Sequence, residues 1–273
     1  MLYKPFLRWA GGKRWLIPKL LELIPDDFTV YQESFLGSGA LFFALFSKYG
    51  NTKKYILSDL NADLINLYTI LRDNSEDLFK VLRDYRNTEK DYYIIRNKKH
   101  DNNIEQAAQF FYLNRTSFNG IYRVNKFGMY NVPYGHKEYQ NLFDYSLLES
   151  CSFALSKVSL KTCDFTKAYR NAKKKLTYLD PPYTVAHENN GFIKYNQKIF
   201  SWEDQKRLAK YLQTIREKND YYILSNAYHE STIDLFKPFG EIIIADRYSL
   251  IGGSLANRNK INEIIITNIN SRR

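Results

Sequence analysis

Two strand-like segments flank a helix-like segment in residues 29–60, and this pattern constrains the fold more than any other feature of the chain. Residues 29–35 have the composition of a strand and lead into Gly37-Ser38-Gly39. Residues 40–49 have the apolar spacing of a helix, and residues 54–60 resemble a second strand. A strand, a glycine turn, a helix and a strand in this order predict a βαβ unit.

The C-terminal third continues this alternation. Residues 175–183 form a strand of the buried type that ends in a Pro-Pro turn, and residues 201–218 have a helical pattern with Ser201 as the expected N-cap. Short apolar strands are expected at 221–227, 241–247 and 261–269. The chain is therefore predicted to be an α/β protein with a mostly parallel, Rossmann-like sheet and helices on both faces.

The region between these parts has a different character. Residues 66–155 begin with helical patterns, for example at 105–115, and become a loop rich in Asn, Gly, Tyr and basic residues at 114–139. We therefore expect residues 1–65 and 156–273 to form one domain. Residues 66–155 are expected to form an inserted, mainly helical domain.

Charge and cysteine content limit the setting and the partners. The chain has 40 Lys and Arg against 29 Asp and Glu, a net charge of +11, which favours binding of a polyanion such as nucleic acid. The alternative is a solvated, lysine-rich surface. Cys151 and Cys163 have neither metal-ligand spacing nor a disulfide framework, so a reducing, cytoplasmic setting without a metal is expected. No apolar run is long enough to predict a membrane span.

The glycine turn and an acid at the end of the second strand suggest a nucleoside ligand. Gly37 and Gly39 let the backbone approach a ligand, and Asp59, at the end of the second strand, can accept hydrogen bonds from both ribose hydroxyls. The third glycine of a dinucleotide-binding motif is replaced by Phe42, so we favour an adenosine-type ligand without a pyrophosphate. The alternatives are a tight turn without a ligand and, for Asp59, the N-cap of a helix at 61–71.

The sharpest chemical signal is Asp180-Pro181-Pro182-Tyr183 at the end of an apolar strand. The two prolines stiffen the backbone, which can hold a carbonyl oxygen beside the Asp180 carboxylate. Two acceptors at a fixed separation suit an exocyclic amine, and Tyr183 can stack on the ring that carries it. The alternative is an ordinary turn at the end of a strand.

With these motifs, the sequence resembles the Dam-type (alpha-class) DNA adenine-N6 methyltransferases over essentially its whole length. The motifs occur in the order of that family: FLRWAGGK (6–13), FLGSGAL (35–41), LSDLNADLI (57–65), LNRTSFNGIYRVN (113–125), YNVPYG (130–135), DPPY (180–183) and INEIIITN (261–268). The resemblance implies a Rossmann-like methyltransferase domain interrupted by a target-recognition domain.

The resemblance also implies roles for individual residues. The methyl donor would be S-adenosylmethionine, with Asp59 on its ribose and Asp164 and Phe165 beside its adenine. Its full set of binding residues would be Trp9, Lys13, Phe35, Gly37, Ser38, Gly39, Asp59, Asp164, Phe165 and Asp180. The catalytic residues would be Asp180, which meets the amino group of a flipped adenine, with Pro181, Pro182 and Tyr183.

Double-stranded DNA is the implied partner, and most of the residues expected to contact it lie in the inserted region. They are Arg115, Phe118, Asn119, Arg123, Asn125, Pro133, Tyr134, His136 and Lys137, with Arg258 and Lys260 near the C-terminus. Arg115 has a structural alternative, and residues 184–196 are either a loop that closes over the flipped base or an ordinary surface loop. Members that modify GATC commonly carry Arg where this chain has His136, and His cannot reproduce the planar fork of Arg. The GATC specificity is therefore left open.

Rival functions remain at this point. The amine could belong to cytosine N4, an RNA base or a protein glutamine. The Asp that begins the tetrapeptide, together with the family-like NRTSFNG segment (114–120), argues against these. The chain could also be a DNA-binding protein without activity on the same scaffold, or an RNA-binding module. A bacterial or phage origin and a cognate restriction endonuclease acting on the same site are consistent with the resemblance.

Overall fold

The computed structural model describes residues 2–168, 172–184, 200–248 and 260–269. The chain divides into two compact units, and each contains segments that are distant in the sequence. Unit 1 consists of residues 1–14 and 36–164, and unit 2 of residues 15–35 and 165–273. The predicted division into a catalytic domain and an insert at 66–155 has other boundaries and stays a prediction.

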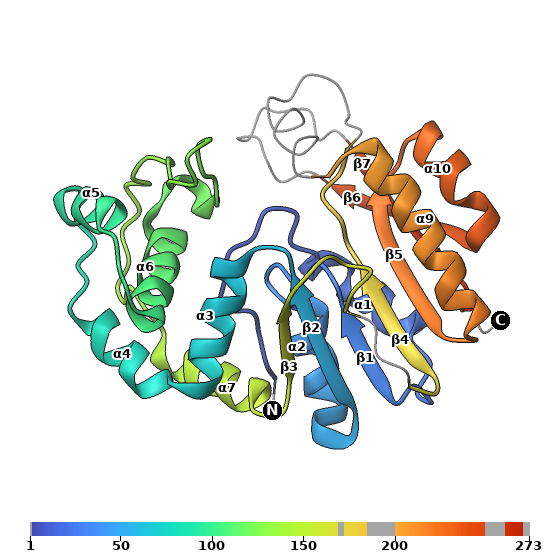
Figure 1. Cartoon of the computed structure of the whole chain (residues 1–273), viewed down its shortest axis with the longest axis horizontal. Helices are drawn as coiled ribbons and strands as arrows, with labels where there is room; N and C mark the ends of the chain where they lie inside the picture. Colours follow the sequence, from blue (N-terminus) through green and yellow to red (C-terminus); the bar gives the residue numbers. More distant parts are fainter. Residues whose placement is uncertain (1, 169–171, 185–199, 249–259, 270–273) are drawn as a thin grey trace. The chain divides into compact units, whose positions relative to one another are not determined.

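Unit 1 combines two parallel strands with a group of helices (Figure 1). Strand β2 (Lys54–Asp59) pairs with β3 (Ser159–Thr162), and α2 (Ala40–Tyr49) precedes β2 in the chain. Residues 66–155 are mainly helical, as expected. The helices of this unit after β2 are α3 (Ala62–Asp73), α4 (Ser75–Arg83), α5 (Glu89–Asn97), α6 (Asn103–Thr116) and α7 (Tyr145–Leu155).

Unit 2 contains the other five strands. Strands β1 (Val30–Glu33), β4 (Lys175–Leu179) and β5 (Tyr221–Ala227) are parallel, and all five residues of β4 are buried. Strand β7 (Lys260–Thr267) is antiparallel to both β5 and β6 (Glu241–Tyr248). The helices described in this unit are α1 (Ile17–Leu23), α9 (Trp202–Glu217) and α10 (Glu230–Phe236).

The strands follow the order β3-β2-β1-β4-β5-β7-β6. The first five positions repeat the 3-2-1-4-5 order of the Rossmann fold. The predicted fold class, a mostly parallel Rossmann-like α/β sheet, is confirmed. Its antiparallel member is β7, which lies between β5 and β6.

Helix α9 shows how local sequence sets the boundaries of an element. The Ser201 side chain accepts the backbone N–H of Asp204, and the Asp204 side chain accepts the N–H of Ser201. Ser201 is therefore the N-cap, as expected, and the two residues form a capping box. The buried face of α9 contributes to the core of unit 2 with Leu208, Leu212 and Ile215. Contacts between α9 and β5 place this face on the sheet (Figure 1).

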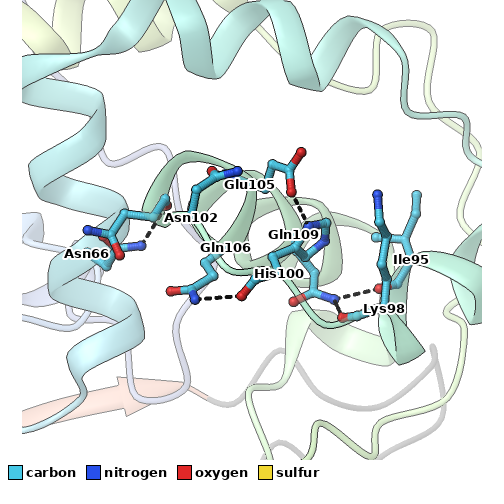
Figure 2. A network of polar contacts seen from close by, with 9 residues as sticks. Asn66, Ile95, Lys98, His100, Asn102, Glu105, Gln106 and Gln109 are labelled. Atoms are coloured by element: carbon cyan, nitrogen blue, oxygen red, sulfur yellow. Dashed lines mark hydrogen bonds and ion pairs between the residues drawn. The ribbon is translucent and has the colours of Figure 1, made fainter.

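A polar network holds the start of α6 in unit 1 (Figure 2). The buried His100 ring lies 2.7 Å from a Glu105 oxygen, measured from its Nδ1 atom. Gln109 donates to the backbone oxygens of Ile95 and Lys98 at 2.6 and 2.7 Å. The contact with His100 lowers the pKa of the Glu105 carboxyl. These bonds fix the connection between α5 and α6. Arg115 is one of the last residues of α6.

Candidate active site

The glycine turn in unit 1 has the left-handed backbone that its sequence predicts. Gly37 has φ +48° and Gly39 has φ +64°, conformations that glycine adopts without strain. A Cβ atom built on Gly37 would lie 2.6 Å from Cδ1 of Trp9. The Trp9 ring therefore lies against Gly37, and the expected approach of a ligand to this backbone stays a prediction. Ser38, between the two glycines, is buried.

Asp59 ends β2 and binds the glycine turn. Its Oδ2 atom accepts the N–H of Gly37 at 3.2 Å, and its Oδ1 atom accepts the N–H of Asn61 at 3.0 Å. The side chain of Asn61 accepts the N–H of Leu64 and is the N-cap of α3. The alternative that Asp59 caps this helix is therefore wrong, because Asn61 fills that position.

The environment of Asp59 favours further hydrogen bonds to its carboxylate. Burial raises the pKa of Asp59, while hydrogen bonds from the backbone N–H groups of Asn61 and Gly37 act in the opposite direction. Each carboxylate oxygen can accept about two hydrogen bonds. The backbone N–H groups of Leu60 and Leu36 also lower the pKa of Asp59, and its predicted contact with a ribose stays a prediction.

Trp9 belongs to an aromatic cluster of unit 1. Its ring is stacked on Tyr122 with centroids 6.0 Å apart and on Phe110 at 6.4 Å. The Tyr122 hydroxyl donates to Asp63 at 3.0 Å. Lys13 is only 5% exposed, which is unusual for a lysine and typical of a functional or structural site. The cluster holds the indole at a defined position beside the glycine turn.

Phe35 and Phe165 form a stacked pair in unit 2. Their centroids are 5.5 Å apart with planes at 27°, and Phe200 packs edge-on against Phe35. Phe165 is a buried core residue, and the Arg207 guanidinium carbon lies 5.0 Å from its ring centroid. Asp164, the last residue of unit 1 in this segment, is half-buried. The predicted contact of these residues with an adenine ring stays a prediction.

The acid-and-proline corner follows β4 in unit 2. Strand β4 ends at Leu179, so Asp180 is the first residue beyond the buried strand and is itself half-buried. Burial raises the pKa of Tyr178 and of Tyr183, and the charge of Asp180 raises both further. The Asp180 carboxylate is therefore close enough to both phenols to act on them electrostatically. The corner keeps a carboxylate and aromatic rings together.

Two sets of hydrogen bonds hold this corner, and sequence reasoning missed both. The Tyr183 hydroxyl donates to Oε2 of Glu263 on β7 at 2.8 Å. Gln205 donates to the Thr184 hydroxyl at 3.2 Å and accepts from Asn226 on β5 at 3.0 Å. Gln205 and Asn226 are fully buried, and Glu263 is 3% exposed. Polar residues among the buried positions of strands and helices were the available signal.

The predicted DNA-contacting segment of unit 1 contains a small hairpin. Val124 and Tyr130 form an antiparallel bridge, and Oδ1 of Asn125 accepts the N–H groups of Phe127 and Met129. The exposed Arg123 donates through Nε to the side chain of Asn131 at 2.8 Å. Residues 106–137 contain no Asp or Glu, so this segment presents only positive formal charge.

Other predicted DNA contacts lie next to the hairpin. Phe118 is 52% exposed, and its N–H donates to the Pro133 oxygen at 2.9 Å. Asn119 has φ +55° and is exposed. Tyr134, in contrast, is buried, and its hydroxyl donates to Asn87. The first two side chains are accessible to a partner, whereas Tyr134 supports the segment from within.

His136 and Lys137 occupy the position where the sequence departs from the family pattern. His136 has φ +49°, and its ring lies edge-on to Tyr134 with centroids 4.8 Å apart. Burial lowers the pKa of Lys137, and the positive charges of Arg8 and Arg115 lower it further. A local excess of cations of this kind favours an anionic partner.

Arg115 makes the contacts of a structural residue. Its Nε donates to the Leu142 oxygen at 3.0 Å, and its guanidinium lies over the Tyr139 ring at 4.6 Å. The Tyr139 hydroxyl donates back to the Arg115 oxygen at 2.6 Å. These contacts favour the structural alternative for Arg115, and a contact with DNA stays a prediction. Arg258 and residues 185–196 lie outside the described residues, and Lys260 is described only as the start of β7.

Within the described ranges, no helix combines the length and the apolar character that crossing a membrane requires. No group of three or more His, Cys, Asp or Glu side chains in the described part of the chain has the arrangement of a metal site. The ring of His229 accepts the N–H of Ser231 and is the N-cap of α10.

Comparisons with known proteins agree with these motifs. The sequence profile described as "D12 class N6 adenine-specific DNA methyltransferase" matches residues 9–250. The chain is 37% identical to the "Type II methyltransferase M1.LlaDCHI" of Lactococcus lactis subsp. cremoris, over 97% of this chain and 95% of that protein. It is 32% identical to a "DNA adenine methylase" of Haemophilus influenzae, over 81% of this chain and 78% of the relative.

A solved structure of the "delta-N METTL16 MTase domain" aligns with a TM-score of 0.40 and 6% identity, over 93% of this chain and 80% of that one. The family profile and the two relatives confirm the resemblance expected from the motifs. Because the profile spans most of the chain and the Lactococcus relative nearly all of it, the chain belongs to the D12 class of N6 adenine-specific DNA methyltransferases.

Proposed function

We propose that this DNA adenine methyltransferase transfers the methyl group of S-adenosylmethionine to N6 of an adenine flipped out of duplex DNA. The observation that carries the proposal is the corner after β4. There Asp180 follows a fully buried strand, its charge raises the pKa of Tyr178 and Tyr183, and the Tyr183 hydroxyl donates to Glu263 at 2.8 Å. A fixed acid among aromatic rings suits a planar base with an exocyclic amine.

Several residues are suited to hold the methyl donor. Asp59 accepts one backbone N–H on each carboxylate oxygen, which is compatible with two ribose hydroxyls. Trp9, Lys13 and the turn from Gly37 through Ser38 to Gly39 would bind beside it. Phe35, Asp164, Phe165 and Asp180 would complete the set that the family resemblance implies. When bound, S-adenosylmethionine supplies a methyl group that its sulfonium already activates.

Asp180 would orient and polarise the amine. Its carboxylate would accept one amine N–H and a backbone oxygen of the corner the other, which leaves the nitrogen lone pair directed at the methyl carbon. Positive charge would develop on this nitrogen as the new C–N bond forms, while the methyl–sulfur bond of the donor breaks and a neutral thioether leaves. The negative Asp180 would stabilise this charge until the extra proton leaves to water. Pro181 and Pro182 would keep the two acceptors at a constant separation.

Tyr183 would stack on the flipped base and replace part of the stacking that the base loses. Removing a base from the duplex costs a few kcal/mol, and an aromatic platform recovers about 1–3 kcal/mol. The Tyr183 hydroxyl donates to Glu263, and this bond restrains the orientation of the ring. This arrangement favours adenine turnover without any covalent intermediate on the protein.

The hairpin segment of unit 1 would bind the DNA. Its acid-free sequence suits the phosphate backbone, and the exposed Phe118, Asn119 and Arg123 can reach bases. Asn125, Pro133 and the segment of Tyr134, His136 and Lys137 would shape this surface. Contacts by Arg115, Arg258 and Lys260 remain part of the proposal.

A role in restriction and modification agrees with the Lactococcus relative, which is called a "Type II methyltransferase". We propose that methylation protects a short sequence from an endonuclease that cuts the same site, with no direct contact between the two enzymes. The reaction would take place where bacterial or phage DNA lies, in the cytoplasm.

The test is to express the chain in cells without adenine methylation and to digest their DNA to nucleosides. We expect N6-methyladenine, and sequencing that detects methylation gives the recognition site. N4-methylcytosine alone, or methylation of RNA alone, would overturn the proposal. Binding of DNA without binding of S-adenosylmethionine in calorimetry would indicate a silent scaffold.

The same assay tests the assigned acid. Asp180→Ala should nearly abolish turnover while the dissociation constant for S-adenosylmethionine changes no more than a few-fold. Asp234→Ala, which removes an exposed aspartate of α10 in the same unit, is the matched control and should keep wild-type turnover. More than a tenth of the wild-type activity in Asp180→Ala would refute the role of Asp180.

A further inference from the structure

Strand β7 contains a buried glutamate, Glu263, that neither the pairing of the strand nor the proposed reaction requires. Glu263 is 3% exposed, and the next three residues, Ile264, Ile265 and Ile266, are fully buried. A carboxylate at such a position is destabilising unless it is hydrogen-bonded, and an apolar residue would suit the strand better. Residues that contradict the local pattern in this way are found mainly at functional sites.

The neighbours of Glu263 include a tyrosine of the corner after β4. In register with Glu263 stand Ala227 on β5 and Ala245 on β6, two small residues that leave space beside it. Oε2 of Glu263 accepts the hydroxyl of Tyr183 at 2.8 Å. Strand β5 separates β4 from β7, a distance of about 10 Å at the usual strand spacing, which the loop after β4 and the length of a tyrosine cover.

We propose that Glu263 is a positioning residue for the methyl-transfer reaction, because it fixes the Tyr183 ring in the orientation that stacks on the target base. The proposal rests on the base-stacking role proposed for Tyr183. Glu263 acts through that ring and does not itself touch the base or the methyl donor.

The chemistry of tyrosine explains why an anchor is needed. The torsion that rotates an aromatic ring about its Cβ–Cγ bond is broad, so packing alone sets the ring angle loosely. A hydrogen bond from the hydroxyl to an ionised carboxylate is short and strong, and it approaches the ring near its plane. The bond to Glu263 thereby defines the ring angle of Tyr183.

The donor in this bond is stable over the working pH range. Burial raises the pKa of the Tyr183 hydroxyl well above its ordinary value, and the charges of Asp180 and Glu263 raise it further. The hydroxyl therefore keeps its proton and can donate to Glu263 throughout. Tyr178, which precedes the corner, is held differently, since its hydroxyl lies 3.1 Å from that of Ser225.

The experiment compares Glu263→Leu with Glu263→Gln in the full chain, on a duplex that carries the site identified by sequencing. Glu263→Gln keeps an acceptor oxygen and should retain kcat within about threefold. Glu263→Leu should lower kcat about tenfold or more, with an unchanged dissociation constant for S-adenosylmethionine. With 2-aminopurine in place of the target adenine, the Leu variant should give brighter emission, because a stacked aromatic ring quenches it.

A matched control distinguishes the loss of the Tyr183–Glu263 bond from the loss of any other buried hydrogen bond of a tyrosine hydroxyl. Tyr222→Phe removes a buried tyrosine hydroxyl of unit 2 that donates to the Phe239 oxygen, and it should leave kcat and 2-aminopurine emission unchanged. Tyr183→Phe should reproduce the loss of kcat, also if Glu263→Leu does not fold. Adding Glu263→Leu to Tyr183→Phe should cause little further loss, because both changes remove the same bond.

The outcomes distinguish the two proposals. If Glu263→Leu keeps wild-type kcat and emission while Tyr183→Ala is inactive, Tyr183 acts on the base and Glu263 has no part in it. If Tyr183→Ala itself keeps full activity, the base-stacking role of Tyr183 is wrong. Equal losses in Glu263→Gln and Glu263→Leu would also overturn the proposal, since the acceptor oxygen would then not matter.

Discussion

Replacing Gly37 by alanine tests how the glycine turn and Trp9 depend on each other. The new Cβ would lie 2.6 Å from Cδ1 and 3.0 Å from Nε1 of Trp9, closer than carbon atoms in folded proteins approach one another. The φ of +48° adds strain of about 1–2 kcal/mol for any residue with a Cβ. Forcing the ring aside adds roughly 1–3 kcal/mol more, as overpacking of a core usually does.

The expected loss of stability is therefore about 2–5 kcal/mol, the sum of these two effects. In a chain of this size each kcal/mol corresponds to about 2–4 °C in Tm, so Gly37→Ala should lower Tm by roughly 4–20 °C. Trp9 would also leave its stack on Tyr122, and we expect S-adenosylmethionine to bind at least tenfold more weakly.

Thermal unfolding and calorimetric titration of S-adenosylmethionine measure both effects. Gly128→Ala is the matched control for stability, because Gly128 has φ +75° with nothing within 4 Å of the added Cβ. It should show the backbone strain alone, about 1–2 kcal/mol. In a Trp9→Ala background, Gly37→Ala should also show only this strain. Equal destabilisation by Gly37→Ala and Gly128→Ala would refute the assigned contact between Trp9 and Gly37.

The remaining predictions concern one ribose ligand, one buried lysine and one DNA contact. Asp59→Ala should weaken S-adenosylmethionine binding at least tenfold in calorimetry, and an unchanged dissociation constant would make Asp59 only a structural residue. Burial lowers the pKa of Lys175 from 10.5 to about 7. Between pH 7 and 10.5 the unfolded chain therefore binds more protons than the folded chain, and the free energy of unfolding rises with pH, by at most about 5 kcal/mol. Lys175→Met should flatten this rise in denaturant titrations from pH 6 to 10, and an unaltered slope would contradict the assignment. Arg123→Ala should reduce the discrimination between the cognate site and a site altered at one base pair by about 1–3 kcal/mol, as measured by competition binding. Equal activity of the variant on the two sites would support a role of Arg123 in base readout. Discrimination as strong as in the wild type would exclude that role.

Much of the candidate site could be predicted because its motifs are local. Asp180 to Tyr183 interrupt an apolar strand, and two prolines in succession have few structural alternatives. The DNA-contacting segment was less predictable residue by residue. Arg115 and Tyr134 are residue types expected at a DNA interface. In the structure, however, Arg115 donates to the Leu142 oxygen and Tyr134 donates to Asn87, so both stabilise the protein itself.

The amino-acid sequence by itself determined the local elements of this protein. The helix at Ala40–Tyr49 and the strand at Tyr221–Ala227 have the boundaries expected from apolar periodicity, since neighbours in the chain decide where such elements begin and end. Strand β3 was missed because three of its residues are only partly buried, the fourth is exposed, and the four lack a clear apolar pattern.

Only the tertiary structure decided which elements and side chains meet. Strand β7 lies between β5 and β6 because of long-range strand pairing, which the local sequence pattern does not predict. The bond between Tyr183 and Glu263 joins residues 80 positions apart, and the contact of Trp9 with Gly37 depends on a turn that brings a distant ring against the backbone. Such contacts form only in the folded chain, because their stability comes from burial and hydrogen bonding that involve several elements at once.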